Sequence, residues 1–210
     1  RGDADAAERH LDAAERHLRA DRHVHGAGRF DSYGSMFLPG FIALLRGDVD
    51  VAERSCSAAL ADAQRSPHPD VHLRGMVLMG LVHLHRGDPE TGQRLLREGL
   101  AEARQVGLTH FERYVLGAIA ATWAMIEPVR GATLLAAIEA LNRRDGRTLT
   151  APIARAVEQA TVEVRESLSD DDLTAAWHHG ATMTLDDAVE LALQHPEGDV
   201  RTDRAGLTPR

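Results

Sequence analysis

Histidine side chains are the first candidates for chemistry in this chain, because imidazole nitrogens are common ligands of zinc and other metals. Six of the twelve histidines form three close pairs, which are His23-x-His25, His83-x-His85 and His178-His179. Residues one or two positions apart on a helix point to different faces, so such a pair does not converge on one ion. No cysteine or carboxylate completes a familiar ligand spacing around them. We therefore expect neither a metal nor any other cofactor.

Acidic residues are a second candidate, because Asp186-Asp187-Ala188-Val189-Glu190 resembles the magnesium-binding acidic motif of helical prenyl-diphosphate enzymes. Thr184 stands where a helix N-cap would, which puts both aspartates in the first helical turn. Negative charge there offsets the helix dipole without any metal ion. Ser169 before Asp170, Asp171 and Asp172 gives the same pattern of a capped helix start. The alternative is an all-helical enzyme, in which the acidic and histidine clusters must converge on one cavity.

The sequence offers few side chains for nucleophilic catalysis and none for lysine chemistry. The sequence contains no lysine, which excludes Schiff-base chemistry and a phosphate-binding loop of the GxxxxGK type. Cys56 is the single cysteine and falls where a small buried hydrophobic residue is expected in a helix. No serine lies in a strand-turn-helix nucleophile elbow. With no catalytic constellation, we expect that the chain is not an enzyme.

Composition narrows the class of protein further. The 210 residues are 43% hydrophobic, yet no apolar run reaches the roughly 20 residues of a membrane span. A net charge of −8 argues against direct binding to a nucleic-acid backbone, since that affinity comes from clustered cations. A single cysteine excludes an internal disulfide, and no signal-peptide pattern opens the chain. We expect a cytoplasmic, helix-rich protein that contacts no membrane.

The elements that carry these residues are set by an internal repeat. Arg-Gly-Asp begins at residues 1, 46 and 86, and a weaker copy without the aspartate begins at Arg130. Glycine readily ends a helix in the left-handed conformation, and aspartate accepts from the free amides that begin the next helix. Small residues follow the glycine of each Arg-Gly-Asp at offsets of five and twelve, at Ala52 and Ala59 for example, and let a neighbouring helix approach. The repeat predicts an all-α chain with units turning near residues 2, 47, 87 and 131.

A resemblance to the tetratricopeptide repeat rests on one pattern. It comprises Met76, Met79, Gly80, His83, Gly87-Asp88, Gly92, Leu96, Gly99 and Leu100, and its second half returns as Gly47, Asp48, Ala52, Cys56, Ala59 and Leu60. The resemblance implies an α-α superhelix of antiparallel helix pairs over residues 1–145, with a C-terminal helical cap over 146–195. Pro39 interrupts the first helix of the unit before Gly47, so we expect a kink or a late start there.

The C-terminal third resembles the end of the helical-repeat region in large ATP-binding transcriptional regulators of the LuxR class. The residues that carry this resemblance are Leu134 to Leu141, Pro152, Arg155, Val164-Arg165, Leu168, Ala176-Trp177, Gly180, Met183 to Val189, Ala192-Leu193 and the final Gly206-Leu207-Thr208-Pro209-Arg210. The resemblance implies that 196–210 is a linker leading to a helix-turn-helix that this chain lacks. Adjacent ATPase and DNA-binding domains would then be partners within the parent protein.

The function that follows from this resemblance is that of a non-catalytic sensor or interaction module. In such arrays the first helix of each pair lines the inner wall. The residues expected on that wall are Phe37, Phe41, Arg74, Val77, Leu81, His85 and Met125. A mostly apolar wall with a few polar points suits a protein helix or a small effector better than a highly charged ligand. Two alternatives stay open: the C-terminal helices or missing domains cover this wall, or it joins two copies of the chain in a homodimer.

Overall fold

The computed structural model describes residues 37–63, 69–149 and 151–194, and all regular structure in these ranges is α-helical. The helices in order are α3 (Leu38–Arg46), α4 (Val49–Ala63), α5 (Pro69–His85), α6 (Pro89–Gln105), α7 (Thr109–Ile126), α8 (Pro128–Asp145), α9 (Ala151–Ser167), α10 (Asp170–Thr182) and α11 (Leu185–Leu193). This confirms the all-α class. None of the described helices has the length and apolar character of a membrane span.

The predicted Gly-Asp junctions are present between α3 and α4 and between α5 and α6. Gly47 and Gly87 each have φ of 79°, a left-handed conformation that glycine adopts without strain. The Asp88 side chain accepts a 3.1 Å hydrogen bond from the Thr91 amide and so caps α6. The fourth turn lies at Glu127, slightly before the expected position, because Pro128 already begins α8. The turn near residue 2 lies outside the described residues.

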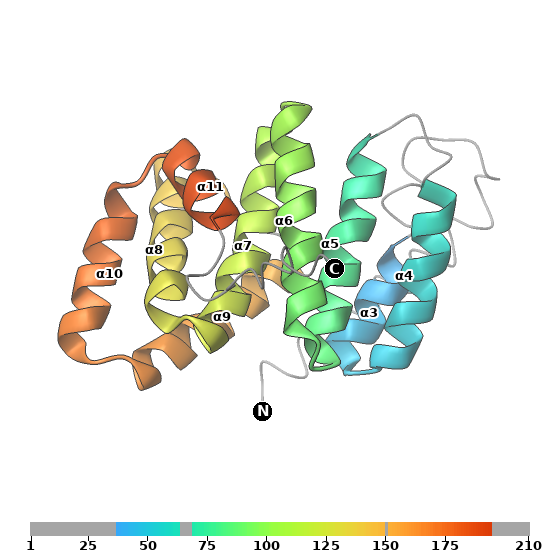
Figure 1. The fold of residues 1–210 in the computed structure, drawn as a ribbon, viewed down its shortest axis with the longest axis horizontal. Coiled ribbons are helices and arrows are strands. Elements are labelled where there is room, and N and C mark those ends of the chain that lie inside the picture. The colour runs from blue at the N-terminus through green and yellow to red at the C-terminus, as the bar shows by residue number, and fades with distance from the viewer. Residues whose placement is uncertain (1–36, 64–68, 150, 195–210) are drawn as a thin grey trace, which may run out of the picture.

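Consecutive helices from α3 to α8 pack against one another, and α4 to α8 follow one another along the long axis of the molecule (Figure 1). Small residues allow the close approach, as the sequence predicts: Ala52 and Ala59 are buried. A Cβ on Gly92 would lie 2.8 Å from the Gly80 carbonyl oxygen, so α5 and α6 touch through their backbones there. Pro39 lies in the first turn of α3, which confirms the late start of that helix.

Two hydrophobic clusters form the core of the described part. One, around α3, α4 and α5, contains Phe37 and Cys56, and the larger one, from α5 to α11, contains the fully buried Trp123. Leu81 is partly buried and packs against both clusters, so it joins the two halves of the core.

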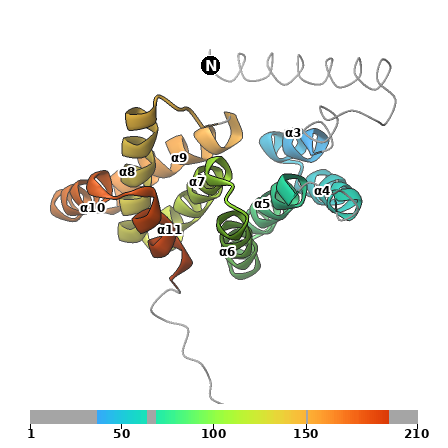
Figure 2. The ribbon, with the colours of Figure 1, turned by 90° about the horizontal axis from the view of Figure 1, so that it is seen from above.

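The last three helices depart from the simple side-by-side order. Helix α9 packs on α7, where Gly117 leaves room for Ile153, and α10 packs on α8, where Gly180 faces the Thr133 carbonyl. Helix α11 contacts α6, α7 and α8 together. Figure 2 shows α9 and α11 on opposite sides of the α7–α8 pair. The last described helix thus packs on both neighbouring hairpins, α5–α6 and α7–α8.

Candidate functional site

The residues expected on the inner wall do not share one environment. Phe37 and Val77 are buried core residues, Phe41 and Leu81 are partly buried, and Arg74, His85 and Met125 are exposed. Phe37 and Val77 therefore present almost no accessible surface in this structure.

The exposed members of the set have different neighbours. The Arg74 guanidinium lies 5.9 Å from the centre of the Phe111 ring, and His85 Nδ1 lies 2.9 Å from the Leu81 carbonyl oxygen. Met125 is 72% exposed and lies fourteen residues after Phe111 on the same helix, about 21 Å along its axis. The structure therefore brings Arg74 to the start of α7 and leaves Met125 at the other end of that helix.

An aromatic pair that sequence reasoning missed lies beside Arg74. The rings of Phe111 and Tyr114 are 5.4 Å apart, and burial raises the pKa of the Tyr114 hydroxyl to about 12 although the Arg74 charge opposes the rise. The phenol is therefore neutral at physiological pH, where it can donate or accept a hydrogen bond but cannot act as an anion.

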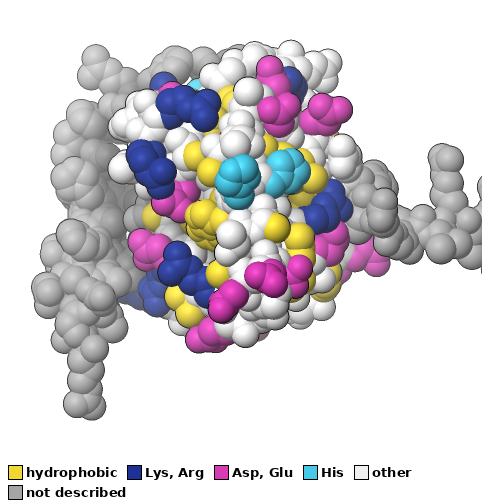
Figure 3. Space-filling view, turned by 90° about the vertical axis from the view of Figure 1, so that its left-hand side faces the viewer, with side chains coloured by type: hydrophobic (Ala, Val, Ile, Leu, Met, Phe, Trp, Pro, Cys, Tyr) yellow, Lys and Arg dark blue, Asp and Glu magenta, His cyan; other side chains and the backbone are white. Residues whose placement is uncertain are grey.

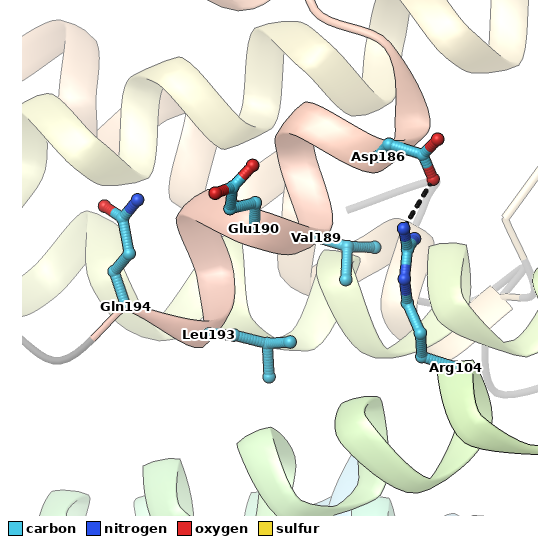
Figure 4. Close-up of a pocket in the computed structure, with 6 residues that line it drawn as sticks. All are labelled: Arg104, Asp186, Val189, Glu190, Leu193 and Gln194. Atoms are coloured by element: carbon cyan, nitrogen blue, oxygen red, sulfur yellow. Dashed lines mark ion pairs between the residues drawn. The ribbon is translucent and has the colours of Figure 1, made fainter.

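A pocket of about 420 Å³ lies along α11, next to the end of α6. It is lined by Arg104, Asp186, Val189, Glu190, Leu193 and Gln194 (Figure 4). All of these residues except Arg104 follow the helical i, i+3, i+4, i+7, i+8 pattern from Asp186, so they form one face of α11 and its C-terminal end. We call this pocket the α6–α11 groove.

Arg104 joins three helices at one end of the groove. Its Nη2 lies 2.7 Å from Asp186 Oδ1 on α11, and its Nη1 lies 3.9 Å from Glu112 Oε1 on α7. Glu112 is only 3% exposed, and its Oε2 has no hydrogen-bond partner among the described residues. Among the described residues, a single long ion pair thus compensates the charge of the buried Glu112 carboxylate.

Glu112 also departs from what its local sequence pattern alone would predict. Thr109 and Glu112 have the spacing of a capping box, but α7 begins one residue earlier than that motif requires, with Leu108 as its N-cap and no side-chain cap bond. Gly107 closes the preceding helix with φ of 71°. The glutamate is therefore free to turn inward toward Arg104.

Arg130 on α8 holds the other end of α11. Its guanidinium lies 4.0 Å from the centre of the Trp123 ring and donates to the carbonyl oxygens of Leu191 and Gln194 at 3.0 and 3.3 Å. It also pairs with Glu127 at 3.0 Å. A cation at this position satisfies carbonyls that a helix C-terminus leaves without partners.

Buried polar atoms without partners concentrate around these two arginines. In the described part of the chain they are His72 Nδ1, Glu112 Oε2, Trp123 Nε1 and Glu127 Oε1. Three of the four belong to residues that contact Arg104 or Arg130. An unsatisfied buried polar group costs about 1–3 kcal/mol of stability. The polar groups around the two arginines that bind α11 are therefore less completely hydrogen-bonded than those in the rest of the described core.

The acidic and histidine clusters of the described residues do not gather in one place: Asp170, Asp171 and Asp172 begin α10, whereas His178 and His179 lie near its end. Asp187 forms a capping box with Thr184, as the sequence predicts, and Asp186 pairs with Arg104. His83 Nδ1 lies 3.2 Å from Asp88 Oδ2 at the α5–α6 turn. Histidines are exposed on the α10 side of the molecule, with hydrophobic side chains beside them and both arginine and acidic side chains further out (Figure 3). Within the described ranges no three histidine, cysteine or acidic residues form a group that could hold a metal ion, and the pair at 23 and 25 lies outside them.

Sequence reasoning also missed Arg104 and Arg130 as functional candidates. Arg104 lies near the end of a helix and Arg130 begins the weak fourth repeat, but nothing local to either residue indicates its partners on α11.

Comparison of the chain with known protein families, with curated proteins and with solved structures gives no match.

Proposed function

We propose that this chain is a non-catalytic sensing and interaction module of a LuxR-type, ATP-binding transcriptional regulator. Its helix pairs form a tetratricopeptide-like superhelix that receives a protein or a small effector. Helix α11, the last described helix, relays the event toward the DNA-binding domain, and the ATPase domain is the partner on the other side.

The observation that carries the relay is the way α11 is held. One end is bound by Arg104 of the α5–α6 hairpin and the other by Arg130 of the α7–α8 hairpin. A shift of one hairpin against the other therefore cannot leave both sets of contacts in place. Because the surrounding polar groups are incompletely satisfied, a second position of α11 can gain hydrogen bonds that the present one leaves unmade, and a ligand that favours it shifts the population.

A substitution far from α11 tests this coupling without a known ligand. A Cβ on Gly80 would lie 2.9 Å from Leu96 Cγ, so Gly80→Ala shifts α6 against α5, whereas Gly99→Ala on the same hairpin meets only ordinary contacts at 3.8 Å. Hydrogen exchange is followed by mass spectrometry and compared with that of the unsubstituted chain. Gly80→Ala should accelerate exchange more in α11 than in α10, and Gly99→Ala should show no such difference between the two helices. An equal change in both helices for Gly80→Ala would contradict the relay.

The family assignment has its own test in the parent gene. We expect the codons directly after Arg210 to encode a helix-turn-helix. A stop codon at that position would remove the support that the Leu207-Thr208-Pro209-Arg210 ending gives to the LuxR resemblance.

An enzyme that uses the acidic motif of α11 is the alternative to be tested directly. Mg²⁺ with a prenyl diphosphate should neither raise the midpoint of thermal unfolding nor lead to consumption of the diphosphate. Turnover that is lost in Asp187→Ala would make the chain an enzyme. Sedimentation at several concentrations tests the homodimer alternative, since a dimerisation element must change its apparent mass with concentration.

A further inference from the structure

Two carboxylates from different helices share the Arg104 side chain, and they hold it unequally. Arg104 Nη2 lies 2.7 Å from Asp186 Oδ1 on α11, whereas Nη1 lies 3.9 Å from Glu112 Oε1 on α7. The first distance is that of a charged hydrogen bond, and the second is too long for one. Figure 4 shows the Arg104 side chain extended from α6 toward Asp186. In this arrangement Arg104 therefore binds α11 in preference to the buried glutamate.

The two carboxylates differ in what can replace the arginine. Each lies in the first turn of its helix, so the helix dipoles favour neither one. The Asp186 side chain is 78% exposed, and water can solvate it when Arg104 leaves. Glu112 is buried, and its Oε2 has no hydrogen-bond partner among the described residues. Because an ion pair is stronger where water is excluded, Arg104 has more to gain at Glu112 than at Asp186.

The packing of α11 prevents Arg104 from binding both carboxylates closely. Ala188 and Val189, which follow Asp186 in the same helix, are buried in the core, so the start of α11 cannot move further inward. A hydrogen bond to Glu112 requires Arg104 Nη1 to come closer by about 1 Å, from 3.9 Å to the usual 2.9 Å. With α11 unable to follow, the two carboxylates compete for one guanidinium.

We propose that Arg104 is a two-position latch for α11. In the first position it binds Asp186 and holds the start of α11 against α6. In the second position the first turn of α11 has moved away, and the guanidinium binds both oxygens of Glu112, as arginine often binds a carboxylate. The ion pair gained between α6 and α7 then offsets part of the one lost to α11. The competition rests on the contacts alone, and its use in signalling rests on the proposed function.

Urea denaturation of variants of the whole chain tests the competition. Glu112→Gln removes a poorly compensated buried charge, so it should raise the urea midpoint of the otherwise unsubstituted chain. In an Asp186→Asn chain Arg104 is free to bind Glu112, so the same Glu112→Gln change should there lower the midpoint. Glu98→Gln removes an exposed carboxylate of α6 that pairs with Arg94, and as the control it should shift the midpoint equally in both backgrounds. Equal shifts for Glu112→Gln in the two backgrounds would overturn the latch.

Hydrogen exchange of Asp186→Asn tests the latch without altering the core, because this side chain is exposed. Exchange in α11 should become about threefold faster, since one exposed ion pair is lost. Exchange in the first turn of α7 should become slower, because Arg104 now binds Glu112 there. A purely structural contact would loosen both segments, so faster exchange in both would overturn the latch.

The latch and the relay fail in different ways. Equal Glu112→Gln shifts in the two backgrounds, together with the expected response of α11 to Gly80→Ala, overturn the latch and leave the relay in place. Opposite shifts, together with equal changes of exchange in α10 and α11 for Gly80→Ala, support the competition for Arg104 and count against the relay.

Discussion

Arg130 stacks on Trp123, with 4.0 Å between the guanidinium carbon and the centre of the ring, and from there it reaches the C-terminal carbonyls of α11. The indole is fully buried and the arginine side chain is 21% exposed, so the contact is largely shielded from water. One side chain from the first turn of α8 therefore orders the last described helix of the chain.

Arg130→Met keeps an apolar stem over the indole but removes the charge and the donors to Leu191 and Gln194. We expect the free energy of unfolding to fall by about 2 kcal/mol, since cation–π contacts and charged hydrogen bonds each contribute about that order. Urea denaturation measures the loss. Arg143→Met, which removes an exposed ion pair with Glu139 on α8, should change stability by less than about 0.5 kcal/mol. Equal losses in the two variants would show that the Arg130 contacts are not structural.

Two glycines in adjacent hairpins should respond in opposite directions to alanine. A Cβ on Gly131 would lie 2.6 Å from the Ala124 Cα, so α7 and α8 must separate, and we expect a loss of about 2–3 kcal/mol. A Cβ on Gly99 meets side chains no closer than 3.8 Å, so the higher helix propensity of alanine should raise stability by about 0.5–1 kcal/mol. Thermal unfolding of the two variants decides this. A midpoint above that of the unsubstituted chain for Gly131→Ala would contradict the close helix contact.

The sequence predicts those parts of the fold that depend on neighbours in the chain. Gly47, Gly87 and Asp88 act at their own turns, and Thr184 caps the helix that follows it, so a local pattern suffices for each. The candidate site depends on residues far apart in sequence. Arg104 meets Asp186 only because α11 folds back over α6, and no repeat or periodicity encodes that return.

Glu112 shows the limit of local reasoning most clearly. Its spacing from Thr109 predicts a capping partner at the surface, yet tertiary packing starts α7 one residue earlier and buries the carboxylate. The inner-wall set has the same weakness, since the repeat register places Phe37 and Val77 on one wall but cannot tell that neighbouring helices cover both. Whether an element distant in sequence buries a residue cannot be inferred from a local pattern and has to be seen in the structure.

Cys56 should react slowly with thiol reagents in the folded chain. It is fully buried against Gly40, and burial raises the pKa of its thiol from 9.0 to about 11. That rise lowers the reactive thiolate fraction about 100-fold at neutral pH, before the loss of access is counted. Reaction with a chromogenic disulfide at pH 7 should therefore be slow in buffer and complete within the mixing time in 6 M guanidinium chloride, with one thiol titrated. Rapid reaction in buffer would show that α3 opens readily from α4.

Asp187 should make the stability of the chain depend on acid pH. Hydrogen bonds from the Thr184 hydroxyl and amide, with a smaller contribution from the His179 charge, hold the pKa of this carboxyl below its usual 3.8. The unfolded chain therefore binds the proton first as the pH falls. The contribution of the cap is fully present above about pH 4 and is lost as the pH falls through the lower pKa of the folded state. Asp187→Asn lacks this contribution, so its deficit in urea denaturation should be constant from pH 5 to 7 and should shrink below pH 4. Asp171→Asn, an exposed first-turn aspartate of α10 with no side-chain bond to a described residue, should show no such narrowing. A deficit for Asp187→Asn that stays the same down to pH 3 would mean that the carboxylate does not hold the start of α11.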